Sequence, residues 1–279
     1  MSLEQDVAHH YGTGDLLARI DAALTELGVD PAHPGVDALK PVDEFHTGGL
    51  EATLALLDQL EITPEMHVAD LGCGIGGTAR HIVHRYGARV TGVDLTPGFV
   101  ATGEALNRRL GYDARITLAE GSVLDLPLED ESADLAVMLH VGMNIADKER
   151  LFAEAARILK PGGRFAVFDV MRGETDGDLV YPLPWSGLPE TSHVAAPGIY
   201  RRAAHAAGFA ELNERDRSDF ARHFFDRVRR HIAAEGLPPL GIHLLMGDSA
   251  RQKIDNYVAN LTAGRIAPTE MIFRKKDGA

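Results

Sequence analysis

The residues best suited to chemistry lie in a glycine-rich segment in the first third of the chain. Residues 70–77 read Asp-Leu-Gly-Cys-Gly-Ile-Gly-Gly, and Gly72, Gly74 and Gly77 have the spacing G-x-G-x-x-G. Glycines at this spacing allow a tight turn between a strand and a helix, and they let the backbone approach a bound nucleotide. Asp94 follows about 20 residues later, where a carboxylate can bind both ribose hydroxyls. The pattern predicts a site for a dinucleotide or another adenosine cofactor.

Asp70 distinguishes between these cofactors. Its carboxylate comes two residues before the first glycine, beside the expected position of a dinucleotide's pyrophosphate, and like charges at that distance repel each other. S-adenosylmethionine (SAM) has no phosphate, and its methionyl ammonium group is a suitable partner for a carboxylate. The sequence therefore favours SAM. An NAD-dependent oxidoreductase stays as an alternative, because the glycine spacing also fits that class.

The elements that must position these residues are alternating strands and helices. Short apolar runs predict strands, and longer segments with apolar residues at helical spacing predict helices between them. The expected strands are 67–71, 89–94, 115–119, 133–139 and 164–170, and the expected helices are 78–86, 97–110 and 148–159. Such alternation is typical of βαβ units with a mostly parallel sheet. The glycine segment would connect the first strand to the first helix.

The two ends of the chain differ from this α/β core. Apolar residues at helical spacing before Gly28 predict a helix over 15–27, residues 29–42 contain three prolines and resemble a linker, and 50–60 is a second periodic run. Later helices are expected at 198–207, 224–234 and 250–261, and strands at 209–217 and 269–274. We expect a helical N-terminal cap over 1–60 and a core over 61–279, with lid insertions near 171–197 and 218–267.

Four motifs in this order resemble the class I SAM-dependent methyltransferases, specifically the small-molecule group with a ubiquinone- or sarcosine-methyltransferase-like core. The motifs are residues 68–77, 93–95, 120–123 and 159–165, and the resemblance covers roughly residues 45–217. It implies a Rossmann-like, seven-stranded, mostly parallel sheet with helices on both faces and an antiparallel final strand, for which 269–274 is the candidate. It also implies SAM as the cofactor.

The resemblance assigns cofactor contacts to individual residues. It implies that Asp70, Gly72 and Gly74 contact the methionyl and ribose parts of SAM. Asp94 would bind the ribose hydroxyls, and Leu95 would pack against the adenine ring.

Three further positions follow from the same resemblance. Ser122 and Val123 would lie at the adenine edge, where the family commonly has an acidic residue before a small apolar one, so the serine is a departure. His140, directly after the fourth expected strand, matches a position that often borders the methionyl chain and the transferred methyl group.

The acceptor side is expected to use residues outside these motifs. His46 lies in a polar, glycine-rich segment that resembles the part of this group that folds over the cofactor. Tyr11 and Trp185 are aromatic residues of the kind that excludes water from a pocket and offers a π face to a cation. We expect His140 and His46 to be catalytic, because a hydroxyl nucleophile needs a base near its proton. Trp185, Tyr11 and His46 are expected to contact the substrate.

Composition narrows the range of partners. The chain of 279 residues has 28 Lys and Arg against 41 Asp and Glu, a formal charge of -13 that repels polyanions, so we expect no nucleic-acid partner. There is no apolar run of membrane-spanning length, no secretory signal, no HxxxH or HExxH pair for a metal, and one cysteine, Cys73. These features predict a cytoplasmic enzyme for a small-molecule substrate, with no membrane or metal, and they are compatible with a homo-oligomer.

The sequence thus predicts a SAM-dependent methyltransferase that transfers a methyl group to a nitrogen or oxygen atom of a small metabolite. Besides the NAD-dependent oxidoreductase, a SAM-binding protein without catalysis is the other alternative, because the motifs concern the cofactor and do not identify an acceptor.

Overall fold

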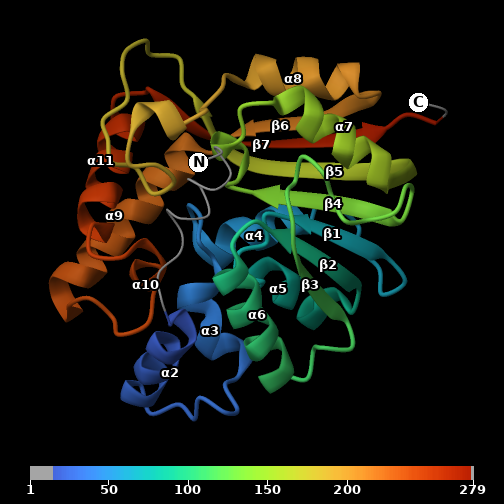
Figure 1. The fold of residues 1–279 in the computed structure, drawn as a ribbon. Helices are drawn as coiled ribbons and strands as arrows, with labels where there is room; N and C mark the ends of the chain where they lie inside the picture. The colour runs from blue at the N-terminus through green and yellow to red at the C-terminus, as the bar shows by residue number, and fades with distance from the viewer. Residues whose placement is uncertain (1–14, 278–279) are drawn as a thin grey trace.

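A seven-stranded sheet forms the centre of the computed structural model, which describes residues 15–277 (Figure 1). The strand order is β3-β2-β1-β4-β5-β7-β6. The strands are β1 (His67–Leu71), β2 (Arg89–Asp94), β3 (Ile116–Glu120), β4 (Ala133–Leu139), β5 (Leu159–Arg172), β6 (Phe209–Asp216) and β7 (Ile266–Lys275). Strands β1 to β5 are parallel, and β7 runs antiparallel to both β5 and β6. The predicted mostly parallel sheet with an antiparallel final strand is confirmed.

Helices cover both faces of this sheet (Figure 1). They are α2 (Leu16–Glu26), α3 (Val36–Asp43), α4 (Gly49–Leu57), α5 (Gly77–Tyr86), α6 (Pro97–Arg109), α7 (Lys148–Ile158), α8 (Pro197–Ala206), α9 (Ser218–Glu235), α10 (His243–Met246) and α11 (Ala250–Thr262). One apolar core lies between the sheet and α7 and α8, and a second lies between the sheet and α4, α5 and α6. Burial of apolar side chains on both faces is what holds a parallel sheet between helices.

One sequence expectation was wrong. Residues 29–42 do not form a linker throughout, because α3 occupies Val36–Asp43. Val36, Leu39 and Val42 are buried at helical spacing, and their burial outweighs the cost of Pro41 inside the helix. The proline content masked this short apolar stripe.

Segments from the two ends of the chain pack together beside the sheet. Helices α2, α3, α6 and α10 share a buried cluster that includes Ile20, Leu24, Leu39 and Leu245. Helices α9 and α11 share another cluster with residues around Trp185. These two clusters place α3, α10 and the segment near Trp185 close to the carboxyl ends of the parallel strands.

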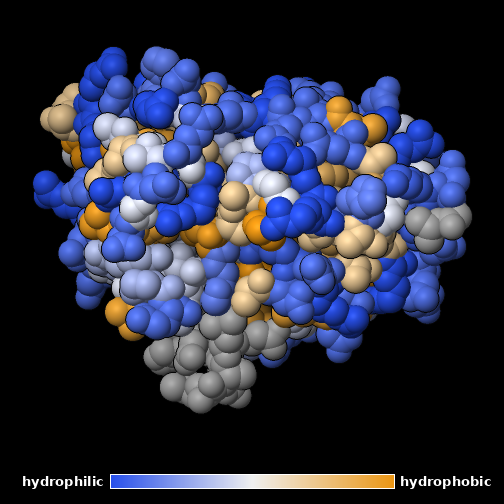
Figure 2. All heavy atoms as spheres, turned by 90° about the horizontal axis from the view of Figure 1, so that it is seen from above, coloured by the Kyte–Doolittle hydropathy of each residue, from blue (hydrophilic) through white to orange (hydrophobic). Residues whose placement is uncertain are grey.

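The outer surface differs from these clusters. Figure 2 shows a face that is largely hydrophilic, with hydrophobic side chains in small groups. Among residues 15–277, no helix has the length and apolar character needed to cross a membrane.

Candidate active site

The glycine loop between β1 and α5 is fixed to the end of β2. Gly72, Gly74 and Gly76 have φ angles of 75°, 55° and 80°, in the left-handed region that favours glycine. The Gly74 N–H donates to Asp94 Oδ2 over 2.8 Å, and the Thr96 N–H donates to Asp94 Oδ1 over 2.9 Å. The Asp94 carboxylate therefore holds the loop and also faces the cavity beside it.

Two of these glycines are needed for different reasons. A Cβ at Gly72 would lie 2.3 Å from Val141 Cγ2, so packing against the loop after β4 excludes any side chain there. A Cβ at Gly74 would meet no protein atom within 4 Å, and Gly74 lines the cavity. Glycine at position 74 therefore leaves space for a ligand that approaches the backbone.

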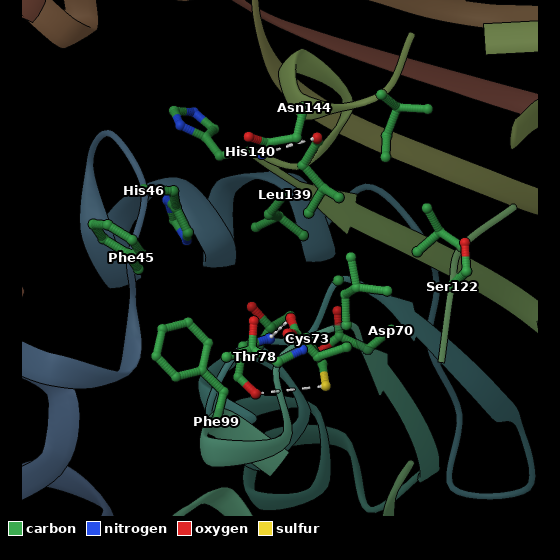
Figure 3. Close-up of a pocket in the computed structure, with 18 of the residues that line it drawn as sticks. Phe45, His46, Asp70, Cys73, Thr78, Phe99, Ser122, Leu139, His140 and Asn144 are labelled. Carbon is green, nitrogen blue, oxygen red and sulfur yellow. Dashed lines mark hydrogen bonds between the residues drawn. The ribbon is translucent and has the colours of Figure 1, made fainter. Parts of the chain in front are cut away.

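One cavity brings together most of the predicted site residues (Figure 3). Its volume is ≈ 1250 Å³, counting the space open to solvent. Ser122 lies toward one end, and Phe45 and Phe99 lie toward the other. The predicted residues that line it are Asp70, Gly72, Gly74, Asp94, Leu95, Ser122, Val123, His140 and His46. Phe45, Phe99 and Asn144 also line it, and no sequence motif singled them out.

Among the described residues, the Asp, Glu, Lys and Arg side chains that line this cavity are all acidic. Asp43, Asp70, Asp94 and Asp147 line it, and no Lys or Arg from residues 15–277 does. A pyrophosphate would face these carboxylates without a cationic partner. The lining therefore argues against a dinucleotide and suits a ligand that carries a positive charge.

Asp70 is the most perturbed of these acids. It is 2% exposed, and its Oδ2 atom has no hydrogen-bond partner. Burial, followed by the neighbouring charges of Glu44 and Asp94, raises the pKa of Asp70 to about 8. A bound ammonium group would supply the missing partner. The methionyl end of SAM fits this requirement.

The segment before α4 closes over the glycine loop through a buried ion pair. Arg80 on α5 donates from Nε to Asp43 Oδ2 over 3.1 Å and from Nη2 to Asp43 Oδ1, and both side chains are fully buried. Arg80 Nη1 also donates to the Ile75 carbonyl over 2.8 Å. A Cβ at Gly77 would lie 2.0 Å from the Asp43 carbonyl oxygen. Asp43 is therefore packed against the start of α5, and Phe45 and His46, which follow it in the chain, line the cavity beside the glycine loop.

Both ring nitrogens of His46 contact protein groups. Nε2 lies 2.5 Å from Glu44 Oε2, and Nδ1 lies 3.2 Å from the Thr47 carbonyl oxygen. Glu44 is also buried, and it accepts from Thr53 Oγ1 over 2.7 Å. The carboxylate of Glu44 thus fixes the orientation of His46.

His140 has the opposite character. It follows β4 with a φ angle of 55°, and its N–H donates to the Phe168 carbonyl over 2.7 Å. Its Nε2 atom is buried without a hydrogen-bond partner. Burial lowers the pKa of His140 well below its usual value, so the ring is neutral near pH 7. A neutral ring with an uncommitted nitrogen can exchange a proton or hydrogen bond with a ligand.

A buried lysine binds backbone carbonyls of the loop that follows His140. Lys148 Nζ donates to the carbonyls of Gly142 over 2.8 Å and His193 over 3.1 Å, and also to that of Ile145. Asp169 lies nearby and accepts from Tyr200 Oη over 2.6 Å. These contacts fix the loop that carries His140 and Asn144.

A second cavity adjoins the first, and Phe45, His46 and His140 line both. Its other walls come from elements distant in sequence: residues 184–185, α9, α10 and α11. Trp185, predicted as a substrate residue, lies here, is 2% exposed, and donates from Nε1 to Ser192 Oγ over 2.9 Å. Tyr11 lies outside the described residues.

Sequence reasoning missed several aromatic residues of this second cavity. Phe224 and Phe225 lie on α9, and Tyr257 lies on α11. Each of them belongs to an apolar face of a helix, which is the pattern of an ordinary core residue. Only the packing of α9 against α11 reveals that these faces surround a cavity.

Comparison with known proteins agrees with this geometry. Residues 69–167 match the family model described as a methyltransferase domain. The sarcosine/dimethylglycine N-methyltransferase of Halorhodospira halochloris is 28% identical over 208 residues, covering 74% of this chain and 73% of that protein. A solved Galdieria sulphuraria protein, provisionally described as a sarcosine dimethylglycine methyltransferase, is 25% identical with a TM-score of 0.64, covering 81% of this chain and 85% of that one.

A further solved structure, the [4+2]-cyclase SpnF, shares the fold alone, with 21% identity and a TM-score of 0.72 over 99% of this chain and 97% of that one. Other structures of this fold contain SAM or S-adenosylhomocysteine (SAH). Residues 69–167 thus form a methyltransferase domain, and the fold, the glycine loop and these relatives support a class I SAM-dependent methyltransferase. The chain is accordingly an enzyme, and its methyl donor is SAM.

Proposed function

We propose that this enzyme transfers the methyl group of SAM to a nitrogen or oxygen atom of a small molecule held in the second cavity. The observation that carries the proposal is that His46 and His140 line both cavities, so a cofactor in one and an acceptor in the other would meet beside them. Bound SAM supplies an electrophilic methyl group on a cationic sulfur. The protein's part is to align the acceptor with that group and to exclude water.

Individual residues take the following proposed roles. Asp70 pairs with the methionyl ammonium group, supported by its buried oxygen without a partner. Gly72 and Gly74 let the cofactor approach the loop. Asp94 binds the ribose hydroxyls, and Leu95 packs on the adenine ring; both line the cavity.

The adenine edge is proposed to lie at Ser122 and Val123. Both residues line the cavity, and Ser122 lies at the end away from Phe45 and Phe99 (Figure 3). Ser122 Oγ accepts from the Leu124 N–H over 3.0 Å, which fixes the side chain at this end of the cavity.

The catalytic roles are divided between the two histidines. His140 accepts the proton of a hydroxyl acceptor, supported by its neutral ring and uncommitted Nε2. His46, paired with Glu44, orients the acceptor beside His140, and Trp185 forms part of the wall. An amine acceptor would need only to arrive unprotonated. Tyr11 stays a predicted substrate contact.

We further propose that residues 1–60 act as a cap and that the segments near 171–197 and 218–267 act as a lid over the core. Residues from all three segments line the cavities, which supports this division. A cytoplasmic location is proposed from composition, since the chain has a single cysteine. The net charge of -13 also leads us to propose that the protein has no nucleic-acid partner, and its composition is compatible with a homo-oligomer.

The experiment that tests the function is thermal unfolding with SAH, SAM or NAD, followed by measurement of SAH formation with candidate acceptors. A ligand at 100 times its Kd stabilises a protein by about 2.7 kcal/mol, which raises Tm by roughly 5 to 10 °C for a chain of this size. We expect a shift with SAH and SAM and none with NAD. A shift with NAD alone would contradict the proposal, and binding of SAM without SAH formation from any acceptor would favour the non-catalytic alternative.

Replacement of Asp94 by alanine is expected to weaken SAH binding by at least about tenfold, because a hydrogen bond to a charged group contributes about 1.5 to 3 kcal/mol. Isothermal titration measures the change. Glu120→Ala is the matched control: Glu120 pairs in register with Asp94 on the neighbouring strand, is exposed, and is not part of the cavity lining. Equal affinities for Asp94→Ala and wild type would contradict the ribose role.

The affinity for SAH is expected to rise between pH 6 and pH 8. Asp70 has a pKa of about 8 in the free protein, so below that pH the carboxyl must lose a proton to pair with the ammonium group. The affinity should therefore increase by up to about tenfold per pH unit and level off near pH 8. SAH is the suitable ligand because it keeps the amino group and lacks the sulfonium charge.

Asp70→Asn supplies the control for this pH dependence. The variant cannot ionise at this position, so its SAH affinity should be weaker than that of the wild type at pH 8 and nearly flat between pH 6 and pH 8. Calorimetry in buffers of different ionisation enthalpy measures the released proton directly. A slope that persists in Asp70→Asn would assign the titration to another group.

A further inference from the structure

The side chains that line the second cavity carry little formal charge. Within residues 15–277, none of its lining residues is Asp, Glu, Lys or Arg. The lining consists of Phe45, His46, Thr47, His140, Met143, Pro184, Trp185, Phe224, Phe225, Ile242, Met246, Ile254 and Tyr257. Sarcosine and dimethylglycine carry a carboxylate, which would find no cationic side chain in this lining. The cavity therefore differs from what those substrates need.

The polar groups of the lining are almost all committed to other protein groups. Thr47 Oγ1 and Tyr257 Oη lie 2.6 Å apart, and Trp185 Nε1 donates to Ser192. His46 contacts Glu44 and the Thr47 carbonyl. His140 Nε2 is the polar side-chain atom of the described lining that is buried without a partner. An ionic group placed here would lose its hydration without compensation.

The aromatic rings are also arranged against one another. Trp185 and Tyr257 form an edge-to-face pair with centroids 6.1 Å apart, and Phe224 and Phe225 form another at 5.3 Å. The ring centroids of Phe225 and Tyr257 lie 5.2 Å apart. Ring faces that a cation would need are thus partly covered by neighbouring rings. The geometry favours apolar contact over binding of a quaternary ammonium group.

Resting on the methyl transfer proposed above, we propose that this cavity takes an uncharged, largely apolar acceptor that presents a hydroxyl group to His140 Nε2. The hydroxyl oxygen forms the new C–O bond as the S–CH₃ bond breaks, and both electrons of the broken bond stay on sulfur. The hydroxyl proton passes to His140 Nε2. The products are a methyl ether and SAH, and His140 returns its proton to solvent.

Three hydroxyl compounds of nearly one shape separate the effect of charge from that of size. 3-tert-Butylphenol is neutral, 3-hydroxyphenyltrimethylammonium is its cationic isostere, and 3-hydroxybenzoate is an anion on the same ring. Binding of each to the SAH-saturated enzyme is measured by calorimetry, and SAH formation is measured with SAM. We expect the neutral probe to bind at least tenfold tighter than either ion and to be methylated faster than sarcosine or dimethylglycine.

Several results of these measurements would contradict the proposed acceptor. Tighter binding of either ionic probe, no binding of any of the three, or faster methylation of sarcosine or dimethylglycine would overturn this assignment. Failure of SAH itself to bind would instead reject the proposed function, so the two failures are distinguishable.

A charge introduced into the wall provides a second test. Phe225→Arg is expected to shift the preference between 3-tert-butylphenol and 3-hydroxybenzoate by at least tenfold toward the anion. Ile232→Arg is the matched control, since Ile232 lies two turns further along α9, is 38% exposed and is not in the lining. Ile254→Arg places the same charge on α11 if Phe225→Arg does not fold. An unchanged preference in a folded, SAH-binding wall variant would contradict the proposal.

Discussion

Replacement of His140 by alanine is expected to lower methylation of a hydroxyl acceptor by about 10²- to 10⁴-fold, the usual contribution of a positioned general base. SAH affinity should fall much less than turnover, because His140 only borders the methionyl chain, while Asp70 and Asp94 make the charged cofactor contacts proposed above. The uncommitted Nε2 of His140 and its neutral ring carry this expectation. Turnover of 3-tert-butylphenol at saturating SAM measures the effect.

Two controls separate catalysis from structure. His193→Ala removes another partly buried imidazole with a lowered pKa that lies outside both cavity linings, and it should retain turnover. Because the pKa of His140 lies well below its usual value, protonation should not slow the wild-type enzyme as the pH falls from 8 to 7 at saturating SAM. A loss of less than about tenfold in His140→Ala would contradict the base role.

Replacement of Asp43 by alanine is expected to destabilise the protein by about 3 to 5 kcal/mol, because it leaves the buried Arg80 guanidinium without its counter-ion. For a chain of this size, Tm should fall by roughly 6 to 20 °C. The glycine loop should also loosen, since Arg80 holds the Ile75 carbonyl. Thermal unfolding and SAH titration measure the two effects.

The double variant Asp43→Leu with Arg80→Met tests the cause. It removes both charges together, so it should recover much of the stability that Asp43→Ala loses. Asp37→Ala is the matched control, because Asp37 lies on the same helix and pairs with Lys40 at the surface, and its Tm should stay unchanged. A double variant as unstable as the single one would show that the ion pair is not the reason.

The core of the fold and the cofactor side of the site could be predicted because their signals are local. The turn from β1 to α5 needs glycines at fixed positions, and Asp94 at the end of β2 bonds directly to that turn. Parallel strands end at one edge of a sheet, so residues that follow different strands converge there. Ser122 follows β3 and His140 follows β4, so their positions in the sequence already indicated this edge of the sheet, where both line the cavity.

The acceptor side could not be predicted to the same degree, because it depends on packing between distant elements. Phe225 and Tyr257 have the spacing of ordinary core residues, and only the approach of α9 to α11 makes them cavity walls. No sequence motif assigned a role to Glu44, yet its carboxylate orients the His46 ring. Helix α3 was not predicted because the prolines in and before it are typical of a linker, and its apolar stripe has only three residues.

The shared packing of α2, α3 and α10 also bears on how the chain folds during synthesis. Ile20 and Leu24 near the N-terminus share a buried cluster with Leu245, more than two hundred positions later. Such distant contacts close late because a long loop must first be restricted. As the chain leaves the ribosome, the early strands can pair while the N-terminal helices still lack their last partner. The enzyme would then acquire its finished ligand-binding surface only once nearly the whole polypeptide has emerged.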